Sequence, residues 1–94
     1  MSYKLIMKFN WNMDKNKWLS DNRKITFEEI ICLIDEGCLL AVLKHKKKDQ
    51  KIFVIERGGY AFNVPFVEEP DGTCFLKTIY PSRESTKRYI GGEK

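Results

Sequence analysis

The chain has 94 residues and a formal net charge of +4, and 43% of its residues are hydrophobic. This composition excludes an intrinsically disordered chain, and the length is typical of one small domain, which we expect to span residues 1–94. No apolar run approaches the ~20 residues that a membrane-spanning helix needs, and three cysteines are an odd number for a disulfide framework, so we expect a reduced cytoplasmic domain with no membrane partner.

A strand and a helix are predicted at the start of the chain. Alternating apolar and polar residues predict a strand over Tyr3–Phe9 rather than a signal peptide. Asn12 can then cap a helix over about residues 13–21. We expect Trp11 and Trp18 to anchor this helix to the core.

The second helix has a sharper start signal. Thr26-Phe27-Glu28-Glu29 is a capping box, in which the Thr26 hydroxyl accepts from the Glu29 amide and the Glu29 carboxylate reaches back. Ile25 and Ile30 supply the matching hydrophobic staple, and Gly37 is a natural stop. The expected buried stripe consists of Phe27, Ile30, Ile31 and Ile34.

From Leu39 onward the apolar pattern has period two and predicts an antiparallel meander. Its strands are expected over 39–44, 52–57, 60–67 and 73–80, with a polar loop at 45–50, a Gly58-Gly59 hairpin and a turn at 69–72. Ser82 then caps a final helix of about two turns that ends at Gly91-Gly92. The predicted class is α+β: two N-terminal helices packed on a four-stranded meander, which the N-terminal strand can join, and a short C-terminal helix.

Turn chemistry predicts the register, and the register assigns the two faces. Arg57 is expected opposite Tyr60, Phe66 opposite Leu76, and Val64 opposite Thr78. One face is then continuous and apolar, and the helices must cover it; it contains Phe53, Ile55, Tyr60, Phe62, Val64, Phe66, Leu76 and Tyr80. The other face is mixed and contains Ile52, Val54, Glu56, Ala61, Asn63, Pro65, Val67, Phe75, Lys77 and Ile79.

Positive charge gathers in two stretches of the second half. Residues 44–57 contain Lys44, Lys46, Lys47, Lys48, Lys51 and Arg57 against Asp49 and Glu56. Residues 77–94 contain Lys77, Arg83, Lys87, Arg88 and Lys94 against Glu84 and Glu93. Such patches favour an anionic partner. A lysine run in a hairpin loop is also typical of a solvated tip, so both interpretations of the first stretch stay open.

The order of several short motifs resembles the BrnT-like toxins, small bacterial toxins of type II toxin–antitoxin modules whose fold is related to the RelE ribonucleases. The motifs are Phe9-Asn10-Trp11-Asn12 with Lys15, then Ile25-Thr26-Phe27-Glu28-Glu29, then Ser82-Arg83 with Tyr89. This chain departs from the family at Asp21-Asn22-Arg23-Lys24, where Lys-His-Gly is common, and at Lys87-Arg88. The resemblance implies RNA cleavage, toxicity to the host cell and neutralisation by a cognate DNA-binding antitoxin.

Metal-independent RNA cleavage needs a base for the 2′-hydroxyl proton, an acid for the 5′-oxygen, and cations around the phosphate. Lys77 is a candidate base if partial burial and a neighbouring cation lower its pKa. Arg83 and Lys87 lie four residues apart on the final helix, while Glu84 and Arg88 are expected to pair with each other. The predicted catalytic residues are Lys77, Arg83, Lys87 and His45, and the predicted RNA-binding residues are Lys46, Lys47, Lys48, Lys51, Arg57 and Tyr89.

No metal or cofactor is predicted, because His45 is the only histidine and the cysteines show no metal-ligand spacing. The expected partners are RNA, free or on the ribosome, and an antitoxin of ribbon-helix-helix type. Two alternatives to a ribonuclease stay open. One is a non-catalytic basic module that engages nucleic acid or an acidic protein, and the other is a growth inhibitor that blocks its target without cleaving RNA.

Overall fold

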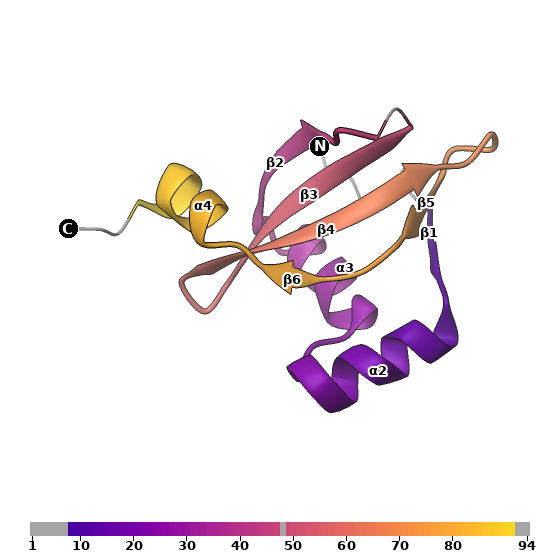
Figure 1. The fold of residues 1–94 in the computed structure, drawn as a ribbon, viewed down its shortest axis with the longest axis horizontal. Coiled ribbons are helices and arrows are strands. Elements are labelled where there is room, and N and C mark those ends of the chain that lie inside the picture. Colours follow the sequence, from indigo (N-terminus) through magenta and orange to yellow (C-terminus); the bar gives the residue numbers. More distant parts are fainter. Residues whose placement is uncertain (1–7, 48, 92–94) are drawn as a thin grey trace.

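A mixed β-sheet forms the frame of the molecule, and two helices lie against one of its faces (Figure 1). The computed structural model describes residues 8–47 and 49–91. The strand order is β1 (Lys8–Trp11), β5 (Thr73–Leu76), β4 (Tyr60–Glu68), β3 (Gln50–Arg57) and β2 (Leu39–Lys44). β1 runs parallel to β5, and the other neighbours are antiparallel. The α+β prediction is confirmed, and the N-terminal strand joins the sheet, although residues 3–7 of its predicted span lie outside the described residues.

Helix α2 (Met13–Arg23) begins as the sequence predicts, since the Asn12 side chain accepts from the Lys15 amide at 3.0 Å. Its anchor is a different residue from the predicted one. Leu19 is fully buried, whereas Trp18 is 43% exposed and lies beside the Lys15 ammonium and the Arg23 guanidinium. The prediction that Trp18 packs into the core is wrong, because the buried side of this largely polar helix runs through Leu19.

Helix α3 (Phe27–Asp35) carries half of the expected capping box. The Thr26 hydroxyl accepts from the Glu29 amide at 3.2 Å, and the staple residues Ile25 and Ile30 are buried. The Glu29 carboxylate does not reach back; it accepts from Arg57 Nε at 2.6 Å instead. A guanidinium supplies a charge-assisted hydrogen bond, which is stronger than one from a neutral amide. The expected reach of Glu29 toward Thr26 is therefore wrong.

The predicted register is confirmed across both tight turns. Arg57 lies opposite Tyr60 and Phe66 opposite Leu76. Gly58 and Gly59 have φ angles of 63° and 84°, the left-handed region that this hairpin requires. Phe53, Val64 and Leu76 are each at most 1% exposed beneath the helices. The main core therefore lies between this face of the sheet and the two helices.

The last predicted strand breaks in the middle, next to Pro65. The Lys77 amide donates to the Pro65 carbonyl at 2.8 Å, but Pro65 has no N–H to return the bond, so the β4–β5 ladder stops. Pairing resumes at β6 (Tyr80–Pro81), where Asn63 lies opposite Tyr80 rather than Ile79. One extra residue is thus accommodated between Leu76 and Tyr80.

This shift corrects two predictions. Ile79 was expected on the open face and is fully buried in the core, where Arg23 of α2 donates to its carbonyl. Tyr80 was expected in the core and instead lies on the face of Asn63. A single residue reverses both assignments because side chains alternate along a strand. The expected Val64–Thr78 pair is likewise not part of the ladder, which ends at Phe66–Leu76.

The C-terminal helix differs from the expected two regular turns. Ser82 caps α4 (Arg83–Ser85), as predicted, and a π-helical turn η1 (Thr86–Ile90) follows it. The Thr86 hydroxyl accepts from the Ala61 amide at 2.9 Å and donates to the Ser82 carbonyl at 2.8 Å, which ties η1 to β4. Within residues 8–47 and 49–91, no helix is long and apolar enough to span a membrane.

Candidate functional site

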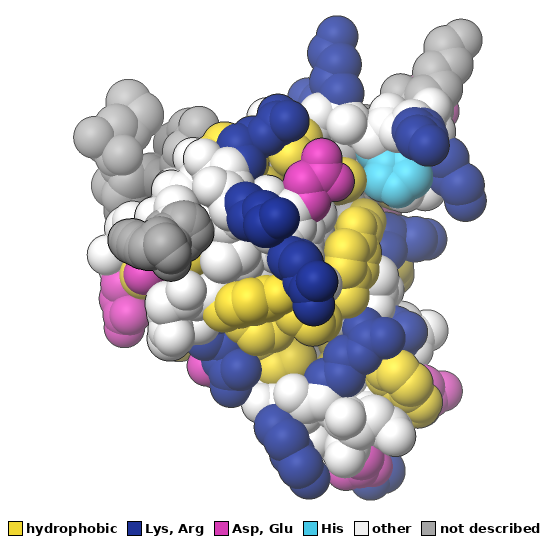
Figure 2. All heavy atoms as spheres, turned by 60° about the vertical axis from the view of Figure 1, so that its left-hand side comes forward, with side chains coloured by type: hydrophobic (Ala, Val, Ile, Leu, Met, Phe, Trp, Pro, Cys, Tyr) yellow, Lys and Arg dark blue, Asp and Glu magenta, His cyan; other side chains and the backbone are white. Residues whose placement is uncertain are grey.

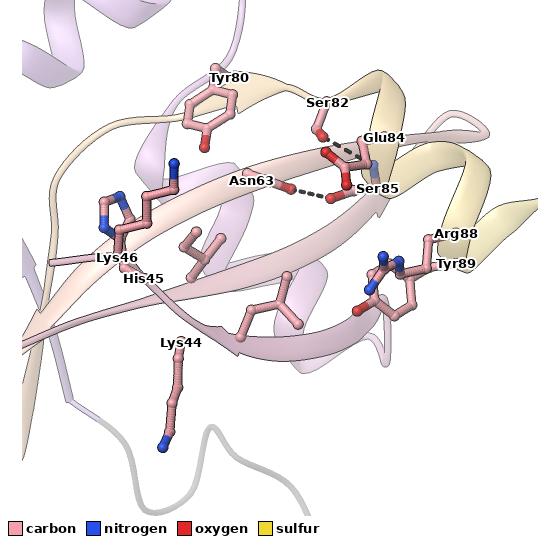
Figure 3. A pocket seen from close by; sticks show the side chains of 12 residues that line it. Lys44, His45, Lys46, Asn63, Tyr80, Ser82, Glu84, Ser85, Arg88 and Tyr89 are labelled. Carbon is pink, nitrogen blue, oxygen red and sulfur yellow. Dashed lines mark hydrogen bonds between the residues drawn. The ribbon is translucent and has the colours of Figure 1, made fainter. Parts of the chain in front are cut away.

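A pocket of about 350 Å³ lies on the face of the sheet opposite α2 and α3. Its floor is formed by Leu43 and Ile52 together with Asn63 of β4. Tyr80 lines it because of the shift after Pro65. One wall comes from the β2–β3 loop and the other from α4 and η1, so that segments far apart in the sequence border the same space (Figure 3).

The two walls carry different chemical groups. The loop wall supplies the His45 imidazole and the Lys46 ammonium. The helical wall supplies the Glu84 carboxylate, the Arg88 guanidinium and the Tyr89 phenol. Figure 3 shows Lys46 and His45 on one side of Asn63, and Glu84 and Arg88 on the other. A ligand in the pocket would therefore meet a carboxylate on one side and an ammonium on the other.

A hydrogen bond across the floor fixes its one buried amide. Ser85 Oγ donates to Asn63 Oδ1 at 2.9 Å, and the Ser85 amide donates to Ser82 Oγ at 3.0 Å. Asn63 is 8% exposed and Ser85 5% exposed. These polar side chains are therefore held in place, whereas Lys46, Glu84 and Arg88 are exposed at the rim.

The orientation of His45 is set by its own loop. Its Nδ1 accepts from the Lys47 backbone amide at 2.9 Å. The neutral imidazole then carries its proton on Nε2 and acts there as a hydrogen-bond donor. The loop thus presents an N–H group together with the adjacent ammonium of Lys46.

The cations of the pocket have no acidic partner among the described residues. Lys44, Lys46 and Arg88 line it, whereas the ion pairs within residues 8–47 and 49–91 are Lys17–Asp21, Lys51–Glu68 and Arg57–Glu29. Figure 2 shows Lys and Arg side chains spread around a band of hydrophobic side chains, with the imidazole of the only histidine at its edge. Charge that is not neutralised internally is available to an anion.

A second hollow of about 480 Å³ lies beside the β2–β3 loop, lined by residues that include Lys51 and Glu68. These two side chains form an ion pair of 3.4 Å, so the hollow offers less free charge. Lys44 borders both spaces, and in Figure 3 its side chain points away from Tyr80 and Asn63.

The structure brings only some of the predicted site residues together. His45, Lys46 and Tyr89 line the pocket, and Lys47 contacts His45 through its backbone. Lys77, Arg83 and Lys87 are exposed and do not line it. The expected partial burial of Lys77 is wrong, because its side chain is exposed; the ammonium lies 5.4 Å from the centroid of the Phe75 ring.

The remaining predicted RNA-binding residues lie elsewhere. Lys51 pairs with Glu68, and Arg57 is held by Glu29 and by the Lys24 carbonyl, on the helix side of the sheet. Lys48 lies outside the described residues. The RNA-binding roles of these residues stay predictions.

Several pocket residues were missed by the sequence interpretation. Glu84 and Arg88 were expected to pair, but they are not among the ion pairs of the described residues, and both line the pocket. Their spacing of four did contain the signal, since it places both on one side of a helix. Tyr80 was assigned to the wrong face, and the presence of Pro65 in β4 was the overlooked warning.

No group of three or more His, Cys, Asp or Glu side chains within residues 8–47 and 49–91 is arranged to hold a metal ion. The nitrogen donors that line the pocket suit an anion, and Glu84 is the one carboxylate among the described residues that line it.

Comparison with known proteins identifies the fold. No protein-family model and no curated protein matches the sequence. Among solved structures, the Brucella abortus ribonuclease toxin BrnT is similar, with a TM-score of 0.60 and 14% sequence identity over 81% of this chain and 96% of that chain. The chain therefore has a BrnT-like fold, as the resemblance of its motifs predicted. What this fold does here depends on the residues of the pocket.

Proposed function

We propose that this chain is the toxin of a type II toxin–antitoxin module and that it cleaves RNA in the pocket between the β2–β3 loop and α4–η1. The observation that carries the proposal is the meeting of Glu84, Arg88, His45 and Lys46 in one hollow on a BrnT-like fold. A carboxylate, a guanidinium, an imidazole and an ammonium can supply the base, the acid and the cationic donors that phosphodiester cleavage needs.

The reaction begins with attack of a ribose 2′-hydroxyl on the adjacent phosphate. Glu84 is the only carboxylate among the described residues that line the pocket, and it accepts the proton of that hydroxyl. The 2′-oxygen then bonds to phosphorus, the bond to the 5′-oxygen breaks, and the product is a 2′,3′-cyclic phosphate. Lys46, on the opposite wall in Figure 3, donates the proton that the departing 5′-oxygen needs.

Charge builds up on the phosphate during this step, and two donors face it. Arg88 offers a planar guanidinium that matches two phosphate oxygens. His45 offers its Nε2–H, because the Lys47 amide occupies Nδ1. His45, one of the predicted catalytic residues, therefore acts in this proposal as a hydrogen-bond donor to the phosphate.

The cations around the pocket supply the affinity for the RNA chain. Lys44, Lys46 and Arg88 are free of acidic partners among the described residues, and Arg83 and Lys87 are exposed on the adjoining helix. Contacts of this kind bind phosphates irrespective of sequence and weaken as salt rises. Tyr89 can stack on a base in the same space.

A toxin requires a partner that restrains it. We propose a cognate antitoxin of ribbon-helix-helix type that is encoded in a short neighbouring reading frame, and we place the reaction in the cytoplasm, where the RNA is.

Expression in a bacterial host tests the proposal. The wild-type chain should arrest growth, and Glu84→Gln, which removes the base but keeps the size, should not. Glu36→Gln serves as the matched control, because Glu36 is an exposed residue at the end of α3, away from the pocket. The proposal is rejected if the wild type leaves growth unaffected, or if Glu84→Gln arrests growth as strongly as the wild type. RNA from arrested cells should carry new 2′,3′-cyclic phosphate ends.

A further inference from the structure

The buried amide at the floor of the pocket has no part in the cleavage chemistry. Asn63 lies in the central strand β4 and is 8% exposed. Its Oδ1 is occupied by the hydroxyl of Ser85 at 2.9 Å. Ser85 is held in turn, because its backbone amide donates to Ser82 Oγ in the cap of α4. The orientation of the Asn63 amide is thus determined by the start of this helix.

The other end of the same amide is open. No described residue accepts a hydrogen bond from Asn63 Nδ2. Yet the described residues include no side-chain nitrogen or oxygen that is both fully buried and without a partner. The Nδ2 is therefore accessible, and the accessible space next to Asn63 is the pocket. The floor thus presents a rigid donor, Nδ2, while the oxygen of the same amide is turned toward Ser85.

The surroundings of this donor suit a flat ring. Leu43 and Ile52 provide an apolar floor, and the half-buried rings of Tyr80 and Tyr89 stand in the walls. A volume of about 350 Å³ is near the lower end of the ~300–1,000 Å³ range of small-molecule sites. Bases stack on aromatic side chains irrespective of their identity, so stacking alone would not select among them.

We infer that the Asn63 Nδ2 reads the O4 oxygen of uracil or the O6 oxygen of guanine and that Ser85 makes this reading selective. The inference rests on the proposed function for the class of ligand. A free asparagine amide recognises adenine through both ends, donating to a ring nitrogen and accepting from the exocyclic amino group. Because Oδ1 is turned toward Ser85, the amino group that adenine or cytosine carries at this place meets the Nδ2 donor and no acceptor. Uracil and guanine carry a carbonyl oxygen there, O4 and O6 respectively, which needs only the donor.

Titration of the wild-type protein with the four 3′-mononucleotides tests the reading without any cleavage. The side-chain amide signal of Asn63 should shift with 3′-UMP or 3′-GMP, and the tighter of these should bind at least about tenfold more tightly than 3′-AMP and 3′-CMP. The comparison of 3′-UMP with 3′-GMP shows whether the pocket prefers a one-ring or a two-ring base. Equal affinities for the four nucleotides, or a preference for 3′-AMP or 3′-CMP, would overturn the inference.

Ser85→Ala tests the role of the hydroxyl. Without it the Asn63 amide can turn over and offer either its oxygen or its nitrogen. The affinity for 3′-UMP or 3′-GMP relative to 3′-AMP and 3′-CMP should therefore fall toward one. Ser20→Ala, on the exposed side of α2, should keep the wild-type ratio. A purely structural role for Ser85 would lower the folded fraction and weaken all four nucleotides equally. An unchanged ratio in folded Ser85→Ala contradicts the selective role, and if this variant does not fold, the wild-type titration still decides.

Failure of this inference and failure of the proposed function give different results. Selective binding of 3′-UMP or 3′-GMP by a protein that cleaves no RNA would reject the ribonuclease and retain the base reading. Glu84-dependent cleavage of RNA with no base preference would support the ribonuclease and reject the base reading.

Discussion

The two faces of the β-sheet are formed by the same strands but have different roles. On the face beneath α2 and α3, Phe53 and Phe66 stack with their ring centroids 3.9 Å apart, and water is excluded. On the other face, within residues 8–47 and 49–91, only the short α4–η1 segment covers β4, at one end of the sheet (Figure 1). Beside it lies a pocket with a buried amide and unpaired cations. Long helices supply stability, and incomplete cover leaves room for a ligand.

The largest effect is expected on the helix-covered face. Phe53→Ala should lower the free energy of unfolding by about 3–5 kcal/mol, because it removes a fully buried ring and leaves a cavity. Val42→Ala, on an exposed position of β2 opposite Phe53, should change it by less than about 0.5 kcal/mol. Urea denaturation measures both, and similar losses for the two variants would show that this face is not the core.

The next pair of variants tests the shift after Pro65. Ile79→Ala should lower the free energy of unfolding by about 2–5 kcal/mol, since Ile79 is fully buried. Tyr80→Ala should cost less stability but should weaken RNA binding, because Tyr80 lines the pocket. The uninterrupted register predicts the opposite order of stabilities, so thermal or urea unfolding of the two proteins distinguishes the registers.

A smaller effect is expected from single cations of the pocket. Arg88→Ala should reduce the slope of log affinity against log salt by about 0.7 for single-stranded RNA, if Arg88 neutralises one phosphate. Lys17→Ala should leave the slope unchanged, because Lys17 pairs with Asp21 on the exposed side of α2. Fluorescence titrations at several salt concentrations measure the slopes, and an equal change in both variants would place the phosphate contacts elsewhere.

The smallest effect is expected in the reactivity of the cysteines, which compares the buried core with the exposed surface of α3 and needs no substitution. Burial raises the pKa of the Cys74 thiol, which is 2% exposed in the core, while Cys32 is exposed on α3. Fewer Cys74 thiolates form at a given pH, and reagent cannot reach them, so Cys74 should react at least about tenfold more slowly than Cys32. Mass spectrometry of partially labelled protein gives both rates, and equal rates would mean that the helix-covered face opens readily.

Local signals in the sequence were sufficient to predict most of the fold. The Thr26 cap, the Gly58-Gly59 hairpin and the Ser82 cap depend on neighbouring residues alone, and each is present as predicted. The register across the tight turns followed from the same chemistry. These elements were predictable because their causes lie within a few residues of one another.

The errors arise where two distant segments compete. The Tyr80 side chain changed faces because Pro65, fifteen residues earlier, has no N–H to give to β5. Glu29 turned from its own cap toward Arg57 of β3. The first of these could have been anticipated, since proline inside a paired strand is typical of a bulge. The second depends on a packing angle that the sequence does not contain.

The candidate site was predicted only in part for the same reason. His45, Lys46 and Tyr89 were selected by residue type, and the structure brings them to one pocket. Lys77 was selected because partial burial was expected on its face of the sheet, but its side chain is exposed and does not line the pocket. Sequence patterns indicate which residues can do the chemistry, but the folded chain determines which of them meet.

The most direct test of the account compares two variants on one RNA. Purified wild type, Glu84→Gln and Lys77→Ala are incubated with a defined RNA in EDTA, and the 2′,3′-cyclic phosphate ends are quantified. Loss of the general base should slow cleavage by about 10²–10⁴-fold in Glu84→Gln, and Lys77→Ala should cleave at close to the wild-type rate. Full activity in Glu84→Gln with loss in Lys77→Ala would contradict the pocket as the site and support the lysine that the sequence alone suggested.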